Sequence, residues 1–370
     1  MNQSTNPTLK PAEAFCNRFG LRVPILLAPM AGVSSTSLSI AVAAAGGLGA
    51  CGALLMEPHE IIAWAREVRS QTSGAFQINL WIPDPEPPRD PEQEAQVRAF
   101  LANWGPPVPP EAGNGKPPDF DKQCQAILAA APPIVSSVMG LYPPDFVQEL
   151  KAKGIKWFAN VSTVREARAA EAAGADVIVA QGSEAGGHRG CFNAADAEHQ
   201  QVGLFALVPA VVDVVRVPVV ATGGIADARG IAAALMLGAS AVQIGTGFLR
   251  CPEAKIHPVW ADALAQTAPE DTVVSRVFSG RAGRSLATRY TRAAMSVGAP
   301  APAPYPVQRG LTSAMRSAAQ KSGDLQRMQA WAGQSAGLTQ AKPAQVLVGQ
   351  LWEGTCKMLG ADGILAAGHV

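Results

Sequence analysis

Short apolar runs recur along the chain, and each is followed by a glycine or polar turn and then by an alanine-rich stretch with helical spacing. Their length and apolar character predict eight buried parallel strands, at Val23–Ala28, Gly47–Cys51, Ala75–Trp81, Ile134–Val138, Ile155–Asn160, Asp176–Ala180, Pro218–Thr222 and Ser240–Gly245. Strands that alternate with helices are joined by right-handed crossovers. A count of eight favours closure into an α/β fold of the TIM (β/α)8 barrel type over an open doubly wound sheet.

Two segments interrupt this alternation. Residues 82–118 are rich in proline, with PDPEPPRDP and GPPVPP on either side of a short helical pattern, and they predict a surface excursion after the third strand. From Cys251 to about Ala330 the pattern becomes helical around APAPAPYP. We therefore expect a barrel in 1–250, a smaller, mainly helical substrate (cap) domain inserted after strand eight in 251–330, and C-terminal helices in 331–370 that return to the barrel.

Two helices carry N-terminal capping residues. Ser162 or Thr163 can cap the helix in TVREARAAEAAGA, and Asp227 can cap the helix in ARGIAAALMLGA. Hydroxyl and carboxylate oxygens at such positions accept hydrogen bonds from the first free backbone N–H groups of a helix. Both stretches end at a glycine, at Gly174 and Gly238, which predicts where each helix stops.

Composition narrows the class of protein. Of the 370 residues 48% are hydrophobic and 16% charged, which is typical of a globular enzyme with a large core. The 30 basic and 29 acidic residues nearly cancel, so neither nucleic acid nor an anionic membrane is expected as a main partner. The apolar stretch from Ile40 to Met56 is interrupted by glycines and predicts no membrane span.

The amino-terminal sequence and the cysteines both favour a cytoplasmic protein. MNQSTNPTLK lacks the charged flank and apolar core of a secretory signal. The six cysteines are scattered, without a CxxC pair or a nearby histidine cluster. We therefore expect reduced thiols, no disulfide framework and no metal site.

Candidate chemistry concentrates in AQGSEAGGHRG, residues 180–190, directly after the sixth strand. The carboxyl ends of barrel strands carry the catalytic residues of such enzymes, and glycines there allow backbone to approach a ligand closely. His188 is the side chain in this loop whose ordinary pKa lies nearest neutrality. It is either a catalytic group or a histidine that only bonds its own loop. Arg189 either helps to anchor an anion or is an exposed, solvated arginine.

Glycine-rich loops also follow strands seven and eight, in ATGGIADARG and QIGTGF. In barrels these two loops commonly hold a phosphate through backbone N–H groups. Gly223, Gly224, Gly245 and the Thr246 hydroxyl are therefore expected to converge on a phosphate. Each loop alone could equally be a tight turn, and it is the pair in the right order that favours binding.

Three further positions lie at strand ends. APMAG offers the backbone of Ala28 and Pro29 and the polarisable thioether of Met30, which lies against a flat ring or in the core. Asn79 and Gln181 interrupt the apolar runs of strands three and six, and either side chain points to the barrel mouth or satisfies a loop backbone.

Together, APMAGVS, QINLW, AQGSEAGGHRG, PVVATGGI, GASAVQIGTGF and WAGQSA resemble the nitronate monooxygenase family, formerly called 2-nitropropane dioxygenases. The motifs are spread over nearly the whole chain. EAGGH and the glycine loops also resemble flavin-dependent enoyl-ACP reductases. The resemblance implies a TIM barrel that binds FMN without covalent attachment and oxidises an alkyl nitronate, such as propionate 3-nitronate, with O2 to a carbonyl compound and nitrite.

The resemblance also implies roles for individual residues. His188 is the catalytic residue, as a base toward a neutral nitroalkane or as a cationic partner of the nitronate. The flavin contacts the residues named here at the first, third and sixth strands and at the phosphate loops: Ala28, Pro29, Met30, Asn79, Gln181, Gly186, Gly223, Gly224, Gln243, Gly245 and Thr246. In the cap Tyr305 keeps a family tyrosine and, with Arg309, is expected near the substrate.

Three positions depart from the family pattern. Val138 stands where better known bacterial members carry a histidine near the substrate, and Arg309 and Ser313 replace a tyrosine and a lysine of the cap. The expected flavin contacts are untouched by these changes. The alternative function is an FMN-dependent NAD(P)H reductase of the quinone or enoyl-ACP type, and a barrel that binds a phosphate ligand without catalysis is a third.

Overall fold

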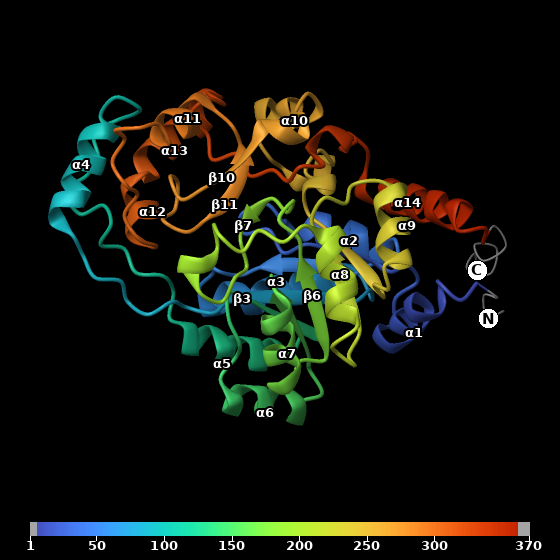
Figure 1. Cartoon of the computed structure of the whole chain (residues 1–370). Coiled ribbons are helices and arrows are strands. Elements are labelled where there is room, and N and C mark those ends of the chain that lie inside the picture. The colour runs from blue at the N-terminus through green and yellow to red at the C-terminus, as the bar shows by residue number, and fades with distance from the viewer. Residues whose placement is uncertain (1–5, 362–370) are drawn as a thin grey trace.

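Eight parallel strands form the centre of the computed structural model, which describes residues 6–361 (Figure 1). They are β1 (Ile25–Leu27), β2 (Gly49–Gly52), β3 (Phe76–Trp81), β4 (Ile134–Val138), β5 (Lys156–Val161), β6 (Val177–Gln181), β8 (Val219–Thr222) and β9 (Ala241–Ile244). All eight overlap the predicted runs. Neighbours pair in the order β1-β9-β8-β6-β5-β4-β3-β2, and the Leu27 N–H donates to the Leu48 oxygen (2.8 Å) across the remaining gap. The predicted TIM barrel is confirmed.

Helices surround the barrel and lie between successive strands. They are α2 (Thr36–Ala44), α3 (Pro58–Gln71), α5 (Phe120–Ala130), α6 (Pro144–Ala152), α7 (Val164–Ala172), α8 (Leu204–Val212) and α9 (Ala228–Met236). Thr163 and Asp227 cap α7 and α9, as predicted, by accepting from the Glu166 and Gly230 N–H groups. After the cap the chain returns as α14 (Ala344–Met358), which packs on α9 and α2.

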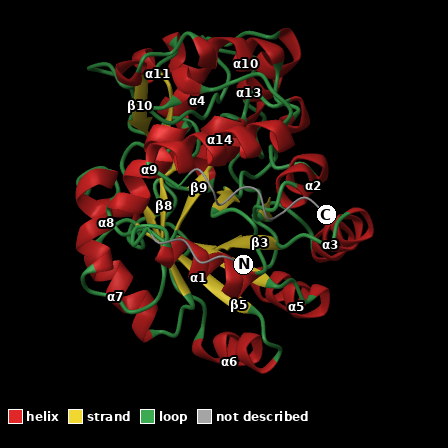
Figure 2. Cartoon of the chain, turned by 90° about the vertical axis from the view of Figure 1, so that its right-hand side faces the viewer, coloured by secondary structure: helices red, strands yellow, loops and turns green. Residues whose placement is uncertain are grey.

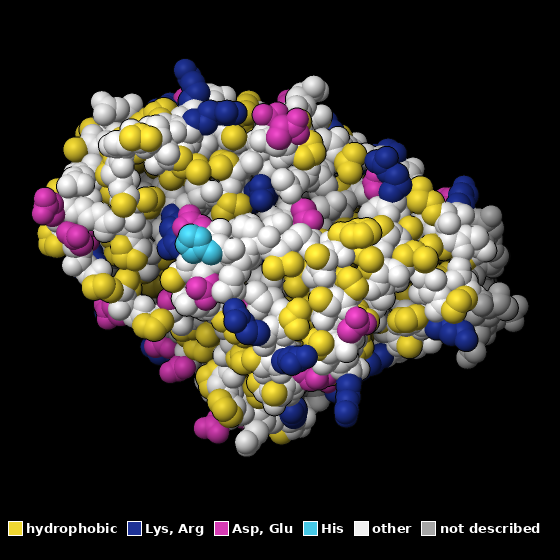
Figure 3. Space-filling view, in the orientation of Figure 1, with side chains coloured by type: hydrophobic (Ala, Val, Ile, Leu, Met, Phe, Trp, Pro, Cys, Tyr) yellow, Lys and Arg dark blue, Asp and Glu magenta, His cyan; other side chains and the backbone are white. Residues whose placement is uncertain are grey.

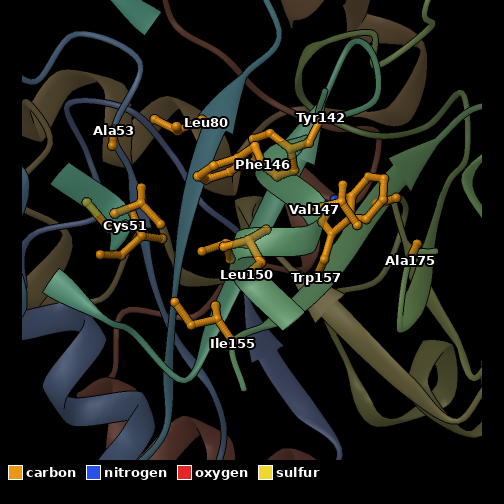
Figure 4. Close-up of a cluster of buried hydrophobic side chains, with 14 of the residues drawn as sticks. Cys51, Ala53, Leu80, Tyr142, Phe146, Val147, Leu150, Ile155, Trp157 and Ala175 are labelled. Atoms are coloured by element: carbon orange, nitrogen blue, oxygen red, sulfur yellow. The ribbon is translucent and has the colours of Figure 1, made fainter. Parts of the chain in front are cut away.

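The barrel strands are buried on both faces, which explains their nearly continuous apolar sequence. Figure 4 shows one hydrophobic cluster, which includes Leu80, Phe146, Leu150 and Trp157 of β5. The indole N–H of Trp157 donates to the Ser137 hydroxyl (3.0 Å). A separate cluster includes two phenylalanines of α1 (Lys10–Phe19), which pack against β5 and β1.

The segment after β9 forms the cap over the carboxyl-terminal ends of the strands (Figure 2). Its elements are α10 (Pro258–Ala265), β10 (Thr272–Ser275), β11 (Gly283–Leu286), α11 (Arg289–Ala294), α12 (Val307–Leu311) and α13 (Ser313–Ser322). The sequence pattern did not predict β10 and β11. They pair antiparallel with each other, and β11 also pairs with β7 (Gly187–His188). The loop that carries His188 is therefore a short strand held by the cap.

The proline-rich excursion packs against this cap. Its helix α4 (Pro91–Leu101) lies beside α11, α12 and α13 in Figure 1, and Val97 and Leu101 share a hydrophobic cluster with Tyr290 and Val307. Asp84 forms an ion pair with the fully buried Arg281 of the β10–β11 connection. Two segments far apart in sequence thus cover the same end of the barrel.

Short 3-10 turns complete the described chain, at Ala194–Asp196, Thr246–Phe248, Pro252–Ala254, Pro269–Asp271 and Ala336–Leu338. On the face drawn in Figure 3, basic and acidic side chains are interspersed and neither sign dominates an area. Between residues 6 and 361, every helix falls short of the length and hydropathy that a bilayer crossing requires.

Candidate functional site

A cavity of about 380 Å³ lies between the carboxyl-terminal ends of the strands and the cap. This volume is in the range of small-ligand pockets, roughly 300–1,000 Å³. It brings together His188, Arg309 and every residue expected at the cofactor: Ala28, Pro29, Met30, Asn79, Gln181, Gly186, Gly223, Gly224, Gln243, Gly245 and Thr246. Tyr305 lines a neighbouring cavity instead.

The loops after β8 and β9 form one side of this cavity. Gly223 and Gly224 have φ of +113° and +68°, a left-handed region that favours glycine. Within residues 6–361 the backbone N–H groups of Gly223 and Gly224 donate to no protein acceptor. Thr246 accepts the Gly333 N–H (2.9 Å), which ties the second loop to the returning chain. Unshared backbone donors of this kind suit an anion such as phosphate.

The side-chain amides of Asn79 and Gln181 line the cavity and also form hydrogen bonds with neighbouring protein groups. Asn79 donates to the Ser136 hydroxyl (3.1 Å), which leaves its carbonyl oxygen toward other partners. Gln181 braces the following loop, since its Nε2 donates to the His188 oxygen (3.2 Å) and its Oε1 accepts the Gly190 N–H (2.8 Å). The sequence allowed Gln181 either to point to the barrel mouth or to bond loop backbone. In the structure it does both.

His188 lies between aromatic rings at the cavity wall. The ring centroids of Trp81 and Trp331 are 4.8 Å and 4.9 Å from that of the imidazole. Its Nε2 is 2.8 Å from the Ser279 hydroxyl oxygen. Gly283 of β11 pairs with His188 through the backbone, so the cap fixes the position of the histidine.

The electrostatic surroundings keep His188 neutral. Burial, together with the positive charges of Arg281 and Arg309, lowers the pKa of His188 to about 3. In this environment the pKa of His188 lies well below the ordinary value for histidine. A neutral imidazole at physiological pH has a lone pair available to accept a proton.

Arginines of the cap supply positive charge to the cavity. Arg309 lines the cavity, and its guanidinium donates no hydrogen bond to the residues of 6–361. Arg316 beside it donates to Thr312, to Gln329 and to the Arg309 carbonyl oxygen. Burial, reinforced by Arg309, lowers the pKa of Arg316 to about 10, so the Arg316 side chain is still a cation at neutral pH.

Arg189, unlike the adjacent His188, does not line the cavity. It is fully buried and donates to the carbonyl oxygens of Gly182 (2.6 Å) and Gln181 (3.4 Å). It lies behind the loop and outside the cavity lining. Both sequence alternatives for Arg189, an anion anchor and a solvated side chain, are wrong.

The three departures from the family pattern lie in different surroundings. Val138 lines the cavity, as Arg309 does, whereas Ser313 is exposed at the start of α13 and is absent from the lining. Tyr305 stacks on Trp81, with centroids 4.9 Å apart and an interplanar angle of 15°. Across residues 6–361 there is no cluster of His, Cys, Asp or Glu that could bind a metal ion.

Sequence reasoning missed several residues of the cavity. Asn160, the next-to-last residue of β5, is polar after an apolar run, the same signal that identified Asn79, and its buried Nδ2 has no hydrogen-bond partner among the described residues. Ser279, Arg316 and Trp331 also line the cavity. They come from the cap and the returning chain, where no strand end marks them.

Comparison with known proteins places this geometry in a family. The family model described as nitronate monooxygenase matches residues 14–354. A nitronate monooxygenase of Paraburkholderia phytofirmans is 39% identical over 342 residues, which cover 90% of this chain and 92% of that protein. The crystal structure of a nitroalkane oxidase from Streptomyces ansochromogenes has a TM-score of 0.85 at 35% identity and covers 94% of this chain and 99% of its own.

A second solved structure, FabK from Thermotoga maritima, has a TM-score of 0.72 at 29% identity and covers 94% of this chain and 97% of its own. The family match spans nearly all of the described chain, including the barrel, the cap and α14. The chain therefore belongs to the nitronate monooxygenase family, whose members are oxidoreductases that generally depend on flavin.

Proposed function

We propose that this chain binds FMN and oxidises alkyl nitronates with O2, giving a carbonyl compound and nitrite. The observation that carries the proposal is one cavity that holds a neutral His188, the glycine loops after β8 and β9, and an Arg309 whose guanidinium has no acceptor among the described residues. A nitronate is an anion that reacts at carbon, so it requires positive charge beside its oxygens and a polar group beside its carbon.

The residues of the cavity fit FMN. The unshared N–H groups of Gly223 and Gly224 suit its phosphate, and Gln243, Gly245 and Thr246 complete that side. Amide groups would suit the polar edge of the ring: the Asn79 oxygen could accept a hydrogen bond there, and Asn160 Nδ2, which has no partner among the described residues, could donate one. The backbone of Ala28, Pro29 and Met30, with Gln181 and Gly186, forms the remaining contacts.

Bound FMN supplies the redox chemistry, and the protein supplies position and charge. His188, which burial keeps unprotonated, is placed to act as the base that removes the α-proton of a neutral nitroalkane. The Ser279 hydroxyl donates to the Arg281 carbonyl oxygen (3.1 Å) and so accepts from His188 Nε2–H, which leaves the lone pair on Nδ1. This argument favours the base over the cationic role.

Arg309 binds the oxygens of the nitronate. Its guanidinium has no protein acceptor among the described residues, and Arg316 holds its backbone in place. A charged hydrogen bond to an anion in a cavity shielded from water is among the stronger polar contacts, about 1.5–3 kcal/mol. Tyr305 does not line this cavity; it stacks on Trp81, which does, and so helps to hold the Trp81 ring in place.

The direct test is the purified protein itself. It should be yellow, and it should release nitrite from propionate 3-nitronate or from an alkyl nitronate under air. A colourless protein, or a flavoprotein inert toward every nitronate, contradicts the proposal.

The second candidate is an FMN-dependent NAD(P)H reductase of a quinone or an enoyl thioester, which the EAGGH motif and the likeness to FabK favour. Rapid bleaching of the flavin by NADH or NADPH without oxygen would support it, whereas the monooxygenase should bleach with nitronate alone.

Cys16, Cys51, Cys124, Cys191 and Cys251 are buried thiols outside any disulfide, which supports a reducing compartment such as the cytoplasm.

A further inference from the structure

A second cavity, of about 420 Å³, lies beside the first under the proline-rich excursion. Its walls are the two connections that flank α4, residues 83–89 and 113–118, together with Tyr305–Val307 at the start of α12 (Figure 1). Phe120 lies on the barrel side. None of these segments holds a residue that the proposed reaction requires, apart from Tyr305.

The second cavity is lined mainly by apolar side chains. Of its charged residues, Arg89 is engaged by Glu94 through two hydrogen bonds, and Asp84 is engaged by Arg281. Glu86 and Lys116 also line the cavity and are exposed to solvent. The remaining surface is mostly prolines, aromatic rings and aliphatic carbon. Contact of such a surface with hydrocarbon lowers the free energy, and it presents few hydrogen-bond donors to a phosphate or a carboxylate.

The two cavities share a wall. Leu54 and Trp81 line both of them. The Trp81 ring has His188 on one side, at a centroid distance of 4.8 Å, and stacks on Tyr305 at 4.9 Å. A tail that extended from a reacting carbon beside His188 into the second cavity would have to pass along Trp81 and Leu54.

We propose that the second cavity is a substrate subsite that binds an uncharged hydrocarbon tail, so that this enzyme prefers long-chain alkyl nitronates over short ones. This inference rests on the proposed function, because the reacting end of the same molecule occupies the first cavity. The proline-rich excursion then acts as the part of the chain that selects substrates by their tail.

Gly115 offers a clean test. It lines the second cavity only, no heavy atom lies within 4 Å of a Cβ built on it, and its φ is outside the left-handed region. Gly115→Trp should therefore place an indole where the tail would lie without disturbing the fold. The matched control is Gly349→Trp, since Gly349 is exposed on α14, lines neither cavity and has equally open space.

Nitrite release is measured under air with the nitronates of nitroethane and 1-nitrooctane. Each buried methylene should raise kcat/KM about three- to fourfold, so the wild type should prefer the long substrate by at least tenfold. Gly115→Trp should lose that preference and keep its rate with the short nitronate, and Gly349→Trp should behave as wild type. Equal kcat/KM for the two substrates in the wild type, or an equal loss for both in Gly115→Trp, overturns the subsite.

Calorimetry separates this inference from the proposed function. Binding of 1-nitrooctane and of nitroethane to the flavin-loaded protein is measured without oxygen, in the wild type and both variants. Tenfold tighter binding of 1-nitrooctane that Gly115→Trp abolishes, with no nitrite from any nitronate, keeps the subsite and overturns the reaction. Nitrite release without any dependence of binding or rate on chain length overturns the subsite alone.

Discussion

Replacing Gly186 by alanine should loosen the cofactor site through the backbone alone. A Cβ at Gly186 would lie 2.5 Å from the Gly333 nitrogen and 2.7 Å from the Ala332 carbonyl carbon, about 0.9 Å and 0.7 Å inside the 3.4 Å at which ordinary contact begins. Both neighbours are main-chain atoms, so no side chain can rotate away. Overpacking of this kind costs about 1–3 kcal/mol.

The displaced segment also carries the Gly333 N–H that Thr246 accepts, so the strain should reach the expected phosphate loop. We expect FMN to bind about tenfold more weakly to Gly186→Ala, which corresponds to about 1.4 kcal/mol, and Tm to fall by a few degrees.

Flavin fluorescence on titration with the apoprotein gives the dissociation constant, and calorimetry of the apoprotein gives Tm. Gly349→Ala is the control, because an alanine there meets no atom within 4 Å and favours the helix. A Gly186→Ala protein with wild-type FMN affinity and Tm would refute this reasoning.

Three further outcomes are expected. His188→Asn should lower kcat with a neutral nitroalkane by at least about 100-fold while FMN stays bound; a colourless variant would show a structural role instead. Because burial and nearby arginines depress its pKa to about 3, the folded state disfavours protonation of His188. Its ring NMR signals, assigned by their loss in His188→Asn, should not titrate between pH 8 and pH 5, and a midpoint near 6.5 would contradict the burial argument. Arg309→Met should raise KM for nitronates about tenfold or more, with partial rescue in Arg309→Lys and unchanged FMN affinity; an unchanged KM would exclude Arg309 as the anion-binding group.

The barrel could be predicted because each strand carries its own signal. A strand buried on both faces must be apolar at successive positions, as in Val177–Gln181 and Val219–Thr222, and its helix is capped by a local residue such as Asp227. The strands Thr272–Ser275 and Gly283–Leu286 carry no comparable signal. They pair with each other, and the second of them also pairs with the two-residue strand at His188, which lies far away in sequence.

The two-residue strand at His188 also explains why the position of Arg189 could not be predicted from the sequence. Successive side chains of an extended segment point to opposite sides, so His188 and Arg189 cannot both face the cavity. The imidazole lies between Trp81 and Trp331, and the guanidinium turns inward to the carbonyl oxygens of Gly182 and Gln181. Nothing in EAGGHRG states which of the two faces outward, because the choice depends on pairing with the cap.

Cofactor and substrate residues differ in how the chain encodes them. The expected FMN contacts are glycines, backbone N–H groups and strand-end amides of one barrel, so short local motifs are enough to specify them. The groups around the substrate depend on contact between separate segments, as where Arg281 of the cap joins Asp84 of the excursion beneath the Trp81 ring. Substitutions in residues 82–118 should therefore change which nitronates are accepted, while the glycine loops that hold the cofactor remain as they are.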